Sequence, residues 1–310
     1  MRRIGIVPIV VAALAVLCLG PPAANAASTA DVVFLIDESG SMGGEHAWLT
    51  NMVSSLDSEF VNAGITGNQY ALVGFGSIDH ASSQAPHKHD VDIVTAGQQD
   101  WGTASQLSAA TVNLVTYGGF EDGWAAIDFA INNYSFRGNA AVNFVLVTDE
   151  DRDNSDSSLT YAGVLSDMQG LNALLNAVVD ASFRTGETPD KVALGVASPG
   201  GGAADANSYK ADGSGGFIKV EGGGYASGGY YNTVADYVDL AWDTGGAAWD
   251  LNQLRAGGLT ADSFTAAFVD VKVEEVGEQP SSYIPEPMTM VGALAGVAGL
   301  AGYLRRRRLA

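Results

Sequence analysis

Cysteine is almost absent from this 310-residue chain, and basic residues are scarce. The one cysteine, Cys18, lies in an apolar run near the N-terminus, so the rest of the chain cannot rely on disulfide bonds. The chain has only 15 Lys and Arg residues but 35 Asp and Glu residues, and six of the 15 basic residues lie at the two ends. A chain this acidic repels phosphate groups, which argues against nucleic acid as a partner.

Recognisable catalytic motifs are also missing. The sequence contains no G-x-S-x-G, no H-E-x-x-H, no Gly-rich phosphate loop and no Cys/His pair. We therefore expect no catalytic residues and a protein that is not an enzyme. A metal-assisted hydrolase, in which an open metal position activates water, is the remote alternative. The apolar fraction of 47% excludes a disordered acidic chain and supplies a substantial core.

The N-terminal 26 residues have the features of a secretory signal peptide. Arg2 and Arg3 precede an apolar run over 4–19, and 24–26 form a small-x-small cleavage site, Ala-Asn-Ala. We expect cleavage after Ala26, which would leave a mature chain without cysteine. A retained membrane anchor is the alternative.

The C-terminal 30 residues, 281–310, contain a second targeting pattern. Pro285-Glu286-Pro287 precedes an apolar run over 288–304 and four arginines at 305–308. A helix over that run would be roughly 25 Å long, just enough to cross a bilayer, with the arginines on the cytoplasmic side. In order and content the segment resembles the PEP-CTERM sorting signal of bacterial envelope proteins.

That resemblance implies recognition by an exosortase-type membrane protease, which removes the helix near the Pro-Glu-Pro element. The alternative is a permanent C-terminal anchor. Both interpretations predict an exported protein of the cell envelope or the extracellular space, held transiently or permanently in the inner membrane by the C-terminal helix.

Between these signals, short apolar runs alternate with stretches of helical spacing. Strands are expected at 32–36, 70–75, 143–147 and 192–197, and helices at 48–63, 105–115, 122–132, 159–178 and 261–273. Continuously apolar strands are typical of a parallel sheet that is buried on both faces. The pattern predicts one α/β domain over 27–280, with a doubly wound, mostly parallel sheet flanked by helices and ligand sites at the C-terminal strand edge.

A Gly-rich stretch interrupts this pattern. Residues 200–229 contain eleven glycines among Ser, Asn, Asp and Tyr. Such a composition predicts a long loop or an inserted flap, over about 199–230, that buries no core of its own. Amphipathic patterning returns at 234–242 and 247–254.

The first apolar strand is followed directly by Asp37-Glu38-Ser39-Gly40-Ser41. Alternate residues at a strand end point the same way, so Asp37, Ser39 and Ser41 can converge. One carboxylate and two hydroxyls are hard oxygen ligands that suit Mg²⁺, Mn²⁺ or Ca²⁺ and are poor ligands for zinc. The alternative is that these side chains only cap the following helix.

The D-x-S-x-S motif at the end of an apolar strand resembles the metal-ion-dependent adhesion site of the von Willebrand factor A (vWA) domain. The resemblance spans roughly 30–275 and implies a doubly wound α/β fold. In that family a fourth ligand, usually Thr, lies in a Gly-rich loop before a helix; the matching stretch here is 118–127, and the aligned residue is Glu121. The fifth ligand would be Asp149, after the strand at 143–147.

The resemblance also implies a function. A cation held by these residues would bind an oxygen of a partner, either a surface protein or an extracellular polysaccharide. A structural matrix or envelope protein, in which the ion mainly stabilises the fold, is the alternative. Either function has a divalent cation, Mg²⁺, Mn²⁺ or Ca²⁺, as the cofactor.

Glu121 is a departure from the family pattern. A third carboxylate raises the affinity for a cation, weakens attraction for a partner's carboxylate and favours Ca²⁺ or Mn²⁺ over Mg²⁺. Asp122 is the replacement ligand if Glu121 points away. Gly44 and Glu45 take the positions of a second metal site in some family members, so a second ion is not expected and Glu45 is only a secondary candidate.

Further carboxylates follow Asp149. Asp151 is a secondary candidate for the metal site, and Asp151, Asp153 and Asp156 are expected to form an acidic rim beside it. An EF-hand-like Ca²⁺ loop is the alternative, although it lacks Gly at the sixth position (Asn154) and Glu at the twelfth (Thr160).

Two groups of side chains lie outside this motif. His80, His87, His89 and Asp90 have a spacing that can bind a transition metal, but a mobile surface loop is the favoured interpretation. Four aromatic residues in or after the Gly-rich stretch either stack on sugars or anchor loops: Tyr225, Tyr230, Tyr231 and Trp242.

Overall fold

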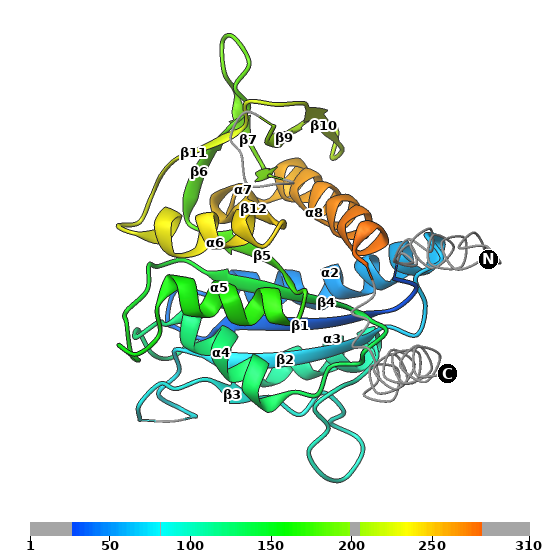
Figure 1. Cartoon of the computed structure of the whole chain (residues 1–310), viewed down its shortest axis with the longest axis vertical. Coiled ribbons are helices and arrows are strands. Elements are labelled where there is room, and N and C mark those ends of the chain that lie inside the picture. The colour runs from blue at the N-terminus through cyan, green and yellow to red at the C-terminus, as the bar shows by residue number, and fades with distance from the viewer. Residues whose placement is uncertain (1–26, 81, 199–204, 281–310) are drawn as a thin grey trace, which may run out of the picture.

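The computed structural model describes residues 27–80, 82–198 and 205–280 (Figure 1). The strands of this part are β1 Ala30–Asp37, β2 Gln69–Phe75, β3 His87–Lys88, β4 Ala141–Thr148, β5 Leu174–Val179, β6 Ala181–Arg184, β7 Val192–Ala193, β8 Gly195–Ala197, β9 Asn207–Ala211, β10 Phe217–Val220, β11 Tyr225–Gly229 and β12 Ala247–Asp250. The α-helices are α2 Gly43–Asn62, α3 Ala104–Ala110, α4 Gly123–Asn133, α5 Tyr161–Gly170, α6 Asp239–Asp243, α7 Leu251–Arg255 and α8 Gly258–Glu278. Short helical turns cover Thr111–Asn113 and Val234–Val238.

The main sheet is mixed. Its strand order is β10-β9-β8-β12-β5-β4-β1-β2-β3, and the five central strands from β12 to β2 run parallel. Antiparallel strands flank them on both sides. β3 pairs with β2 at one edge, and β8, β9 and β10 follow β12 toward the other edge. A second, antiparallel sheet has the order β11-β6-β7. The predicted α/β class with central parallel strands is therefore confirmed.

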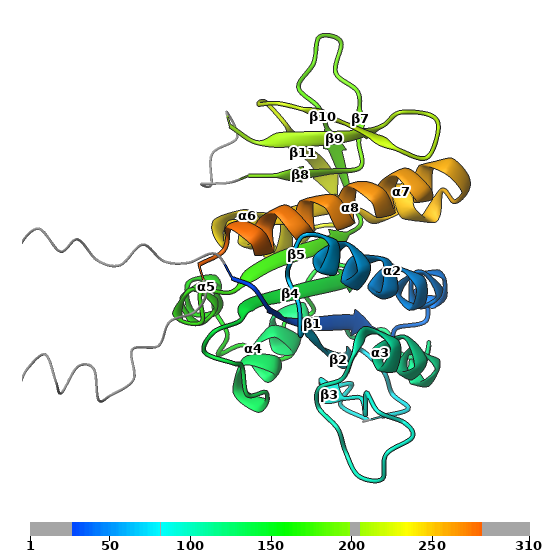
Figure 2. The same cartoon turned by 90° about the vertical axis from the view of Figure 1, so that its right-hand side faces the viewer.

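Helices cover both faces of the central strands (Figure 2). Alternate residues of β1 explain why its sequence is apolar throughout: Val32 and Phe34 pack in the cluster that contains α2 and α8, whereas Val33 and Leu35 pack in the cluster that contains α4 and α5. All eight residues of β1 are buried. A strand buried on both faces cannot alternate between polar and apolar residues.

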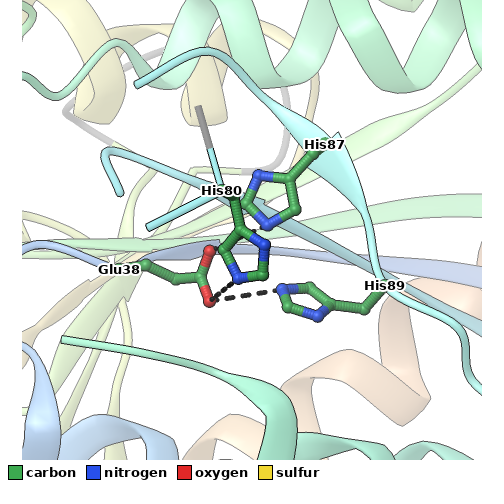
Figure 3. Close-up of side chains that lie close together, drawn as sticks. All are labelled: Glu38, His80, His87 and His89. Carbon is green, nitrogen blue, oxygen red and sulfur yellow. Dashed lines mark ion pairs between the residues drawn. The ribbon is translucent and has the colours of Figure 1, made fainter. Parts of the chain in front are cut away.

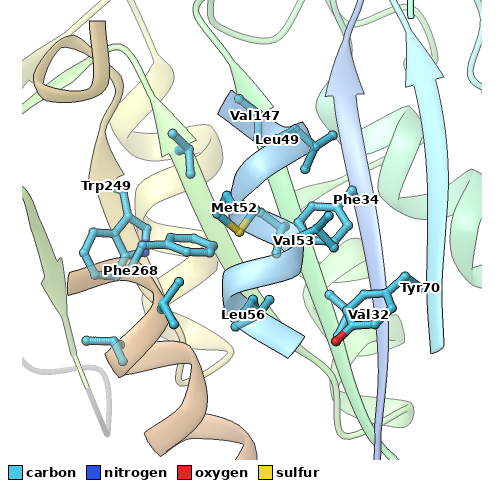
Figure 4. Close-up of a cluster of buried hydrophobic side chains, with 14 of the residues drawn as sticks. Val32, Phe34, Leu49, Met52, Val53, Leu56, Tyr70, Val147, Trp249 and Phe268 are labelled. Carbon is cyan, nitrogen blue, oxygen red and sulfur yellow. The ribbon is translucent and has the colours of Figure 1, made fainter. Parts of the chain in front are cut away.

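The core between the sheet and α2 and α8 is rich in aromatic rings (Figure 4). Trp249 of β12 packs edge-on against Phe268 and Phe264 of α8 and stacks on Tyr209 of β9. The indole Nε1 of Trp249 donates a hydrogen bond to Asn176 Oδ1 at 2.9 Å, which satisfies the only polar atom of that side chain.

Three local predictions were wrong. The expected helix at 159–178 ends with α5 at Gly170, and the apolar residues after it form the buried strand β5. The expected strand at 192–197 divides into β7 and β8, which belong to different sheets. In both places apolar residues without a clear period were assigned to one element instead of two.

The third wrong prediction concerns the Gly-rich stretch. Its described residues form β9, β10 and β11, not a long loop. Tyr209 in β9 is almost fully buried against Trp249, so this stretch does contribute to the core. Gly224 explains part of the glycine content, because a Cβ there would lie only 3.0–3.2 Å from Ser208, Ala206 and Val196.

The predicted signal peptide (1–26) and the PEP-CTERM segment (281–310), with its expected transmembrane helix over 288–304, lie outside the described residues. Among the helices that are described, none has the length and apolar character needed to cross a membrane.

The aromatic core yields a prediction for stability. Replacing Phe268 with Ala should lower the free energy of unfolding by about 3–5 kcal/mol, because the ring is fully buried and leaves a cavity. Leu259→Ala on the same helix is the matched control, since Leu259 is exposed and its loss should change stability by less than about 0.5 kcal/mol. Urea unfolding measures both values, and equal effects would contradict the described packing.

Candidate metal centre

The predicted metal ligands lie at the C-terminal edge of the main sheet. β1 ends at Asp37, and β4 ends one residue before Asp149. Because Ile36 pairs with Val147 in the parallel register, the loops after both strands leave the sheet next to each other. The loop before α4 reaches the same edge, where the backbone N–H of Gly40 donates to Gly118 O.

Two serines link the first carboxylate to the last. The backbone N–H of Ser39 donates to Asp37 Oδ1 at 2.7 Å, and the hydroxyls of Ser39 and Ser41 lie 3.1 Å apart. Ser41 Oγ then donates to Asp149 Oδ1 at 2.9 Å. Asp37 and Ser39 are buried, whereas Ser41 is exposed, so the group of oxygens opens to solvent on the Ser41 side.

Glu121 points into this group and does not turn away from it. Carboxylate oxygens of Asp37, Glu121 and Asp149 lie within 4.8 Å of one another. A divalent cation bound at 2.0–2.6 Å from each oxygen, about the range for Mg²⁺ and Ca²⁺, fits such a spacing. The loop is held in place by Asp153, which accepts a hydrogen bond from Glu121 N at 2.6 Å and donates its own N–H to Glu121 O.

Thr148, the last residue of β4, is part of the site and was not predicted. Its hydroxyl lies 2.9 Å from Asp37 Oδ2 and 3.3 Å from Glu121 Oε2. A hydroxyl has a single proton and can donate it fully to only one of these acceptors, which leaves a place for a further proton between the two carboxyls. Gly76 provides space next to them, because its φ is +81° and a Cβ there would lie 3.0 Å from Asp37 Oδ1.

Burial of the two carboxyls makes that proton favourable. Desolvation, with the mutual hydrogen bond and repulsion of the pair, raises the pKa of Glu121 to about 10. Desolvation is also the largest cause at Asp37, whose pKa rises to about 6 despite hydrogen bonds that lower it. Without a cation, the pair is therefore stable only while it retains a proton.

Arg255 is a second functional residue that the sequence did not reveal. It lies in α7, and its Nη2 donates to Asp149 Oδ2 at 2.8 Å while its Nε pairs with Glu45. Glu45, a secondary candidate for the metal, is thus the buried partner of Arg255 and is not one of the clustered carboxylates. Arg255 follows Asp149 by 106 residues, and nothing in the sequence around either residue indicates that they pair.

Asp122 was the replacement ligand only if Glu121 pointed away, and Glu121 lies in the cluster. Its carboxylate caps α4 by accepting from Ala125 N at 3.1 Å, and it also accepts from Arg152 Nε at 2.9 Å and from Ser155. These partners occupy both carboxylate oxygens. The capping role that the sequence offered as an alternative for the first loop therefore applies to Asp122 instead.

The carboxylates after Asp149 do not converge in the manner of an EF-hand. Asp149 joins the cluster with Asp37 and Glu121, whereas Asp151 lies outside it. Asp153 positions the Glu121 loop, and Asp156 accepts hydrogen bonds within its own turn, from Ser158. Asp153, one of the three residues expected in the acidic rim, thus holds the loop that carries Glu121.

The three histidines do not lie on a separate surface loop. His80, His87 and His89 surround the buried carboxylate of Glu38, the residue after Asp37. Asp90 is not part of this group, because it accepts backbone hydrogen bonds from Asp92 and Gln99. The His-x-His spacing was visible in the sequence. The sequence did not show that Glu38 lies beside these histidines, because only the fold brings them together.

The aromatic residues of the Gly-rich stretch have different environments. Trp242 packs against the core and donates its Nε1–H to Val196 O, so it anchors the fold. Tyr225, Tyr230 and Tyr231 are exposed, and the last two rings lie edge to face at 4.7 Å. The sugar-stacking role stays a prediction for these three.

Neither a protein-family profile nor the sequence of a characterised protein matches the chain. Among solved structures it is similar to proximal thread matrix protein 1 from the mussel byssus, with a TM-score of 0.37 and 14% identity over 50% of this chain and 38% of the mussel chain. It is also similar to a von Willebrand factor type A protein from Catenulispora acidiphila, with a TM-score of 0.33 and 18% identity over 49% of this chain and 33% of that one. The alignments thus span less than two fifths of each of these structures.

The described residues themselves define the class of protein. It is an α/β protein with a mixed sheet, and a cluster of carboxylates and hydroxyls lies where its central parallel strands end. This position is where α/β sheets of this kind bind ligands.

The proton held by Asp37 and Glu121 makes cation binding dependent on pH. A bound cation needs both carboxylates ionised, so binding must release protons, and the affinity should rise with pH. Because burial raises the pKa of both carboxyls, we expect proton release on Mn²⁺ binding, with more protons released at pH 5 than at pH 8. Calorimetric titration in two buffers of different ionisation enthalpy measures this number, and binding without proton release would contradict the shared proton.

Proposed function

We propose that the chain is an exported bacterial protein of vWA type that binds a partner through one divalent cation. The observation that carries this proposal is the convergence of Asp37, Ser39, Ser41, Glu121 and Asp149 at the C-terminal edge of the sheet. Asp37 ends strand β1, and the other four residues lie in loops that follow or precede core elements, so the fold itself brings them together.

The residues present fit a hard divalent cation. Asp37, Glu121 and Asp149 supply charge, and Ser39 and Ser41 supply neutral oxygens. A cation held there offers a coordination position to an oxygen of the partner. Ser41 marks where that position opens, because it is the exposed member of the set.

The number of carboxylates bears on which cation binds. Glu121 replaces the usual neutral Thr, so three negative charges face the ion instead of two. Ca²⁺ and Mn²⁺ tolerate such a charged and irregular set better than Mg²⁺, which demands near-octahedral geometry. The positive charge of Arg255 beside Asp149 offsets part of the added charge.

The partner is a surface protein or an extracellular polysaccharide. The chain is strongly acidic, so an acidic partner would approach it only with cations in between. Export is supported by the signal-peptide pattern at 1–26 and by the PEP-CTERM pattern, which would bring the chain to the inner membrane and to an exosortase-type protease. The protein then acts in the cell envelope or outside the cell.

Binding is favoured over catalysis. The nearest histidine to the serines in sequence, His46, contacts the backbone oxygen of Asp37 at 2.9 Å through Nε2. That contact directs Nε2 to the backbone, whereas the hydroxyls of Ser39 and Ser41 contact each other and Asp149. A metal-assisted hydrolase would need a water-activating role for the same cation, and no further residue of the cluster supports it.

A second candidate function is a structural matrix or envelope protein whose cation mainly stabilises the fold. The observation that favours it is the burial of Asp37 and Glu121 between β1, β4 and α4, where an ion would remove their repulsion. The two functions differ in what the loss of the ion does to partner binding and to stability.

Asp37→Ala separates these candidates. For the adhesion function we expect loss of saturable Mn²⁺ binding and of cation-dependent adhesion between cells that display the full chain, with the melting temperature in EDTA close to that of the unaltered chain. Asp151→Ala is the matched control, because it removes a nearby carboxylate outside the cluster and should change neither. Normal adhesion by Asp37→Ala would sink the adhesion mechanism, and a large loss of Mn²⁺-dependent stabilisation alone would favour the structural one.

Arg255→Gln tests the electrostatic balance of the site. Because the guanidinium pairs with Asp149 and repels a cation, its neutral replacement should strengthen Mn²⁺ binding by roughly three- to tenfold, or about 0.7–1.4 kcal/mol. Lys210→Gln, which removes a positive charge from a distant pair with Glu187, should leave the affinity unchanged. Weaker binding by Arg255→Gln would mean that Arg255 instead holds Asp149 in a ligating position.

A further inference from the structure

A second group of metal-binding side chains lies next to the proposed cation site. Glu38, His80, His87 and His89 each direct one nitrogen or oxygen to a common point, and these four atoms lie within 4.8 Å of one another (Figure 3). Successive residues of a strand point to opposite sides, so Asp37 and Glu38 at the end of β1 serve two different groups.

The fold brings this group together from separate segments of the chain. His87 lies opposite Gly74 in the antiparallel pair of β3 and β2, and the N–H of His89 donates to Leu72 O, so both histidines point from the edge strand back toward β1. Gly74 leaves the space they fill, because a Cβ there would lie 2.1 Å from Glu38 Oε2 and 2.7 Å from His89 Nε2.

Three polar atoms of this group have no hydrogen-bond partner among the described residues. Glu38 Oε2, His87 Nε2 and His89 Nε2 are buried and make no hydrogen bond of normal geometry. One protonated imidazole would neutralise the charge of Glu38, but neither His87 Nε2 nor His89 Nε2 has the geometry of a hydrogen bond to that carboxylate, although both lie close to it. Buried polar atoms without partners are costly, and a bound ion would satisfy all three.

The distances fit a tetrahedral ion. His87 Nε2 lies 3.0 Å from Glu38 Oε2, and the Nε2 atoms of His89 and His80 lie 3.2 Å and 3.7 Å from Glu38 Oε1. Ligands bound to zinc at about 2.0–2.1 Å in tetrahedral geometry are separated by about 3.3 Å. Each contact is near that separation, with His87 approaching Oε2 of Glu38 and the other two histidines approaching Oε1.

The surroundings orient these ligands. The N–H of Val115 donates to Glu38 Oε1 at 2.9 Å, and His87 Nδ1 faces Ala85 O at 3.5 Å. An Nδ1–H that donates to a carbonyl leaves the lone pair of His87 on Nε2, the nitrogen that faces Glu38.

We propose that Glu38, His80, His87 and His89 form a zinc site, distinct from the Asp37 cation site in both residues and chemistry. Three imidazole nitrogens and one carboxylate suit Zn²⁺, whereas the carboxylates and hydroxyls around Asp37 suit hard cations. Four protein ligands complete a tetrahedron, so the site is structural and not catalytic. It ties the β3 edge to the end of β1.

The position of the zinc site gives it an effect on its neighbour. Glu38 O accepts from Tyr117 N at 3.0 Å, and Glu38 Oε1 accepts from Val115 N, so Glu38 holds the loop that leads to Glu121. A fixed Glu38 therefore positions both Asp37 and the Glu121 loop. Loss of zinc should weaken Mn²⁺ binding indirectly, whereas loss of Asp37 should leave zinc binding intact.

Metal analysis of the purified full chain tests the proposal. We expect about one zinc ion per chain, and with Co²⁺ in its place the intense visible absorption typical of tetrahedral coordination. The double variant His87→Ala/His89→Ala should lose both signals, with an affinity loss greater than the about 10–100-fold that follows removal of an outer-shell partner. Asp90→Asn, next to the ligands but outside the group, is the matched control and should retain zinc.

Two further variants keep the outcome decisive. His80→Ala removes the most exposed ligand, so it should fold even if the double variant does not, and it should bind zinc more weakly than the unaltered chain. Asp37→Asn should retain zinc while losing Mn²⁺, which separates this proposal from the proposed function. A folded full chain that takes up no zinc, or zinc retained by the variants of all three histidines, would overturn the site.

Discussion

Two carboxyl groups, Asp37 and Glu121, are buried side by side where β1 ends, and the arrangement around them follows from their repulsion. Neither can ionise freely in that position, so the pair needs a shared proton or a cation. The surrounding residues accommodate the pair. Thr148 and the backbone N–H of Ser39 donate hydrogen bonds to Asp37, and Gly76 leaves space beside it. The burial that creates the repulsion comes from the fold itself, because β1 is covered by helices on both faces and carries Asp37 with it.

The end of β1 also divides two kinds of chemistry. Asp37 faces oxygen ligands from β4 and the loop before α4, whereas Glu38 faces imidazoles from the β3 edge. Asp37 and Glu38 are joined by one peptide bond, so the two groups of ligands share the same piece of backbone. Arg255 and Glu45 form a third set of charges beside Asp149, and they connect the cation site to α2 and α7. Three sets of charged side chains thus meet at the end of β1.

The sequence predicted the parts of this arrangement that depend on local pattern. The apolar run of β1 and the D-x-S-x-S motif after it were identified because a strand buried on both faces leaves a clear signal and its polar end stands out. Glu121 and Asp149 were assigned as ligands through the family resemblance. Thr148, Arg255 and the partnership of Glu38 with the histidines could not be predicted, since each depends on which segments the sheet order brings together. The strands of the Gly-rich stretch were not predicted for a related reason: β9, for example, packs on the core through Tyr209 against Trp249, a contact that the local sequence does not indicate.

The most direct test of the central claim is a crystal structure of the chain soaked with Mn²⁺, with the ion located by its anomalous scattering. The account predicts one Mn²⁺ bound by oxygens of Asp37 and Glu121, with Ser39, Ser41 and Asp149 around it and one coordination position open on the Ser41 side. An ion at this edge that leaves Asp37 and Glu121 in contact through their shared proton, or no ion at this edge at all, would contradict it.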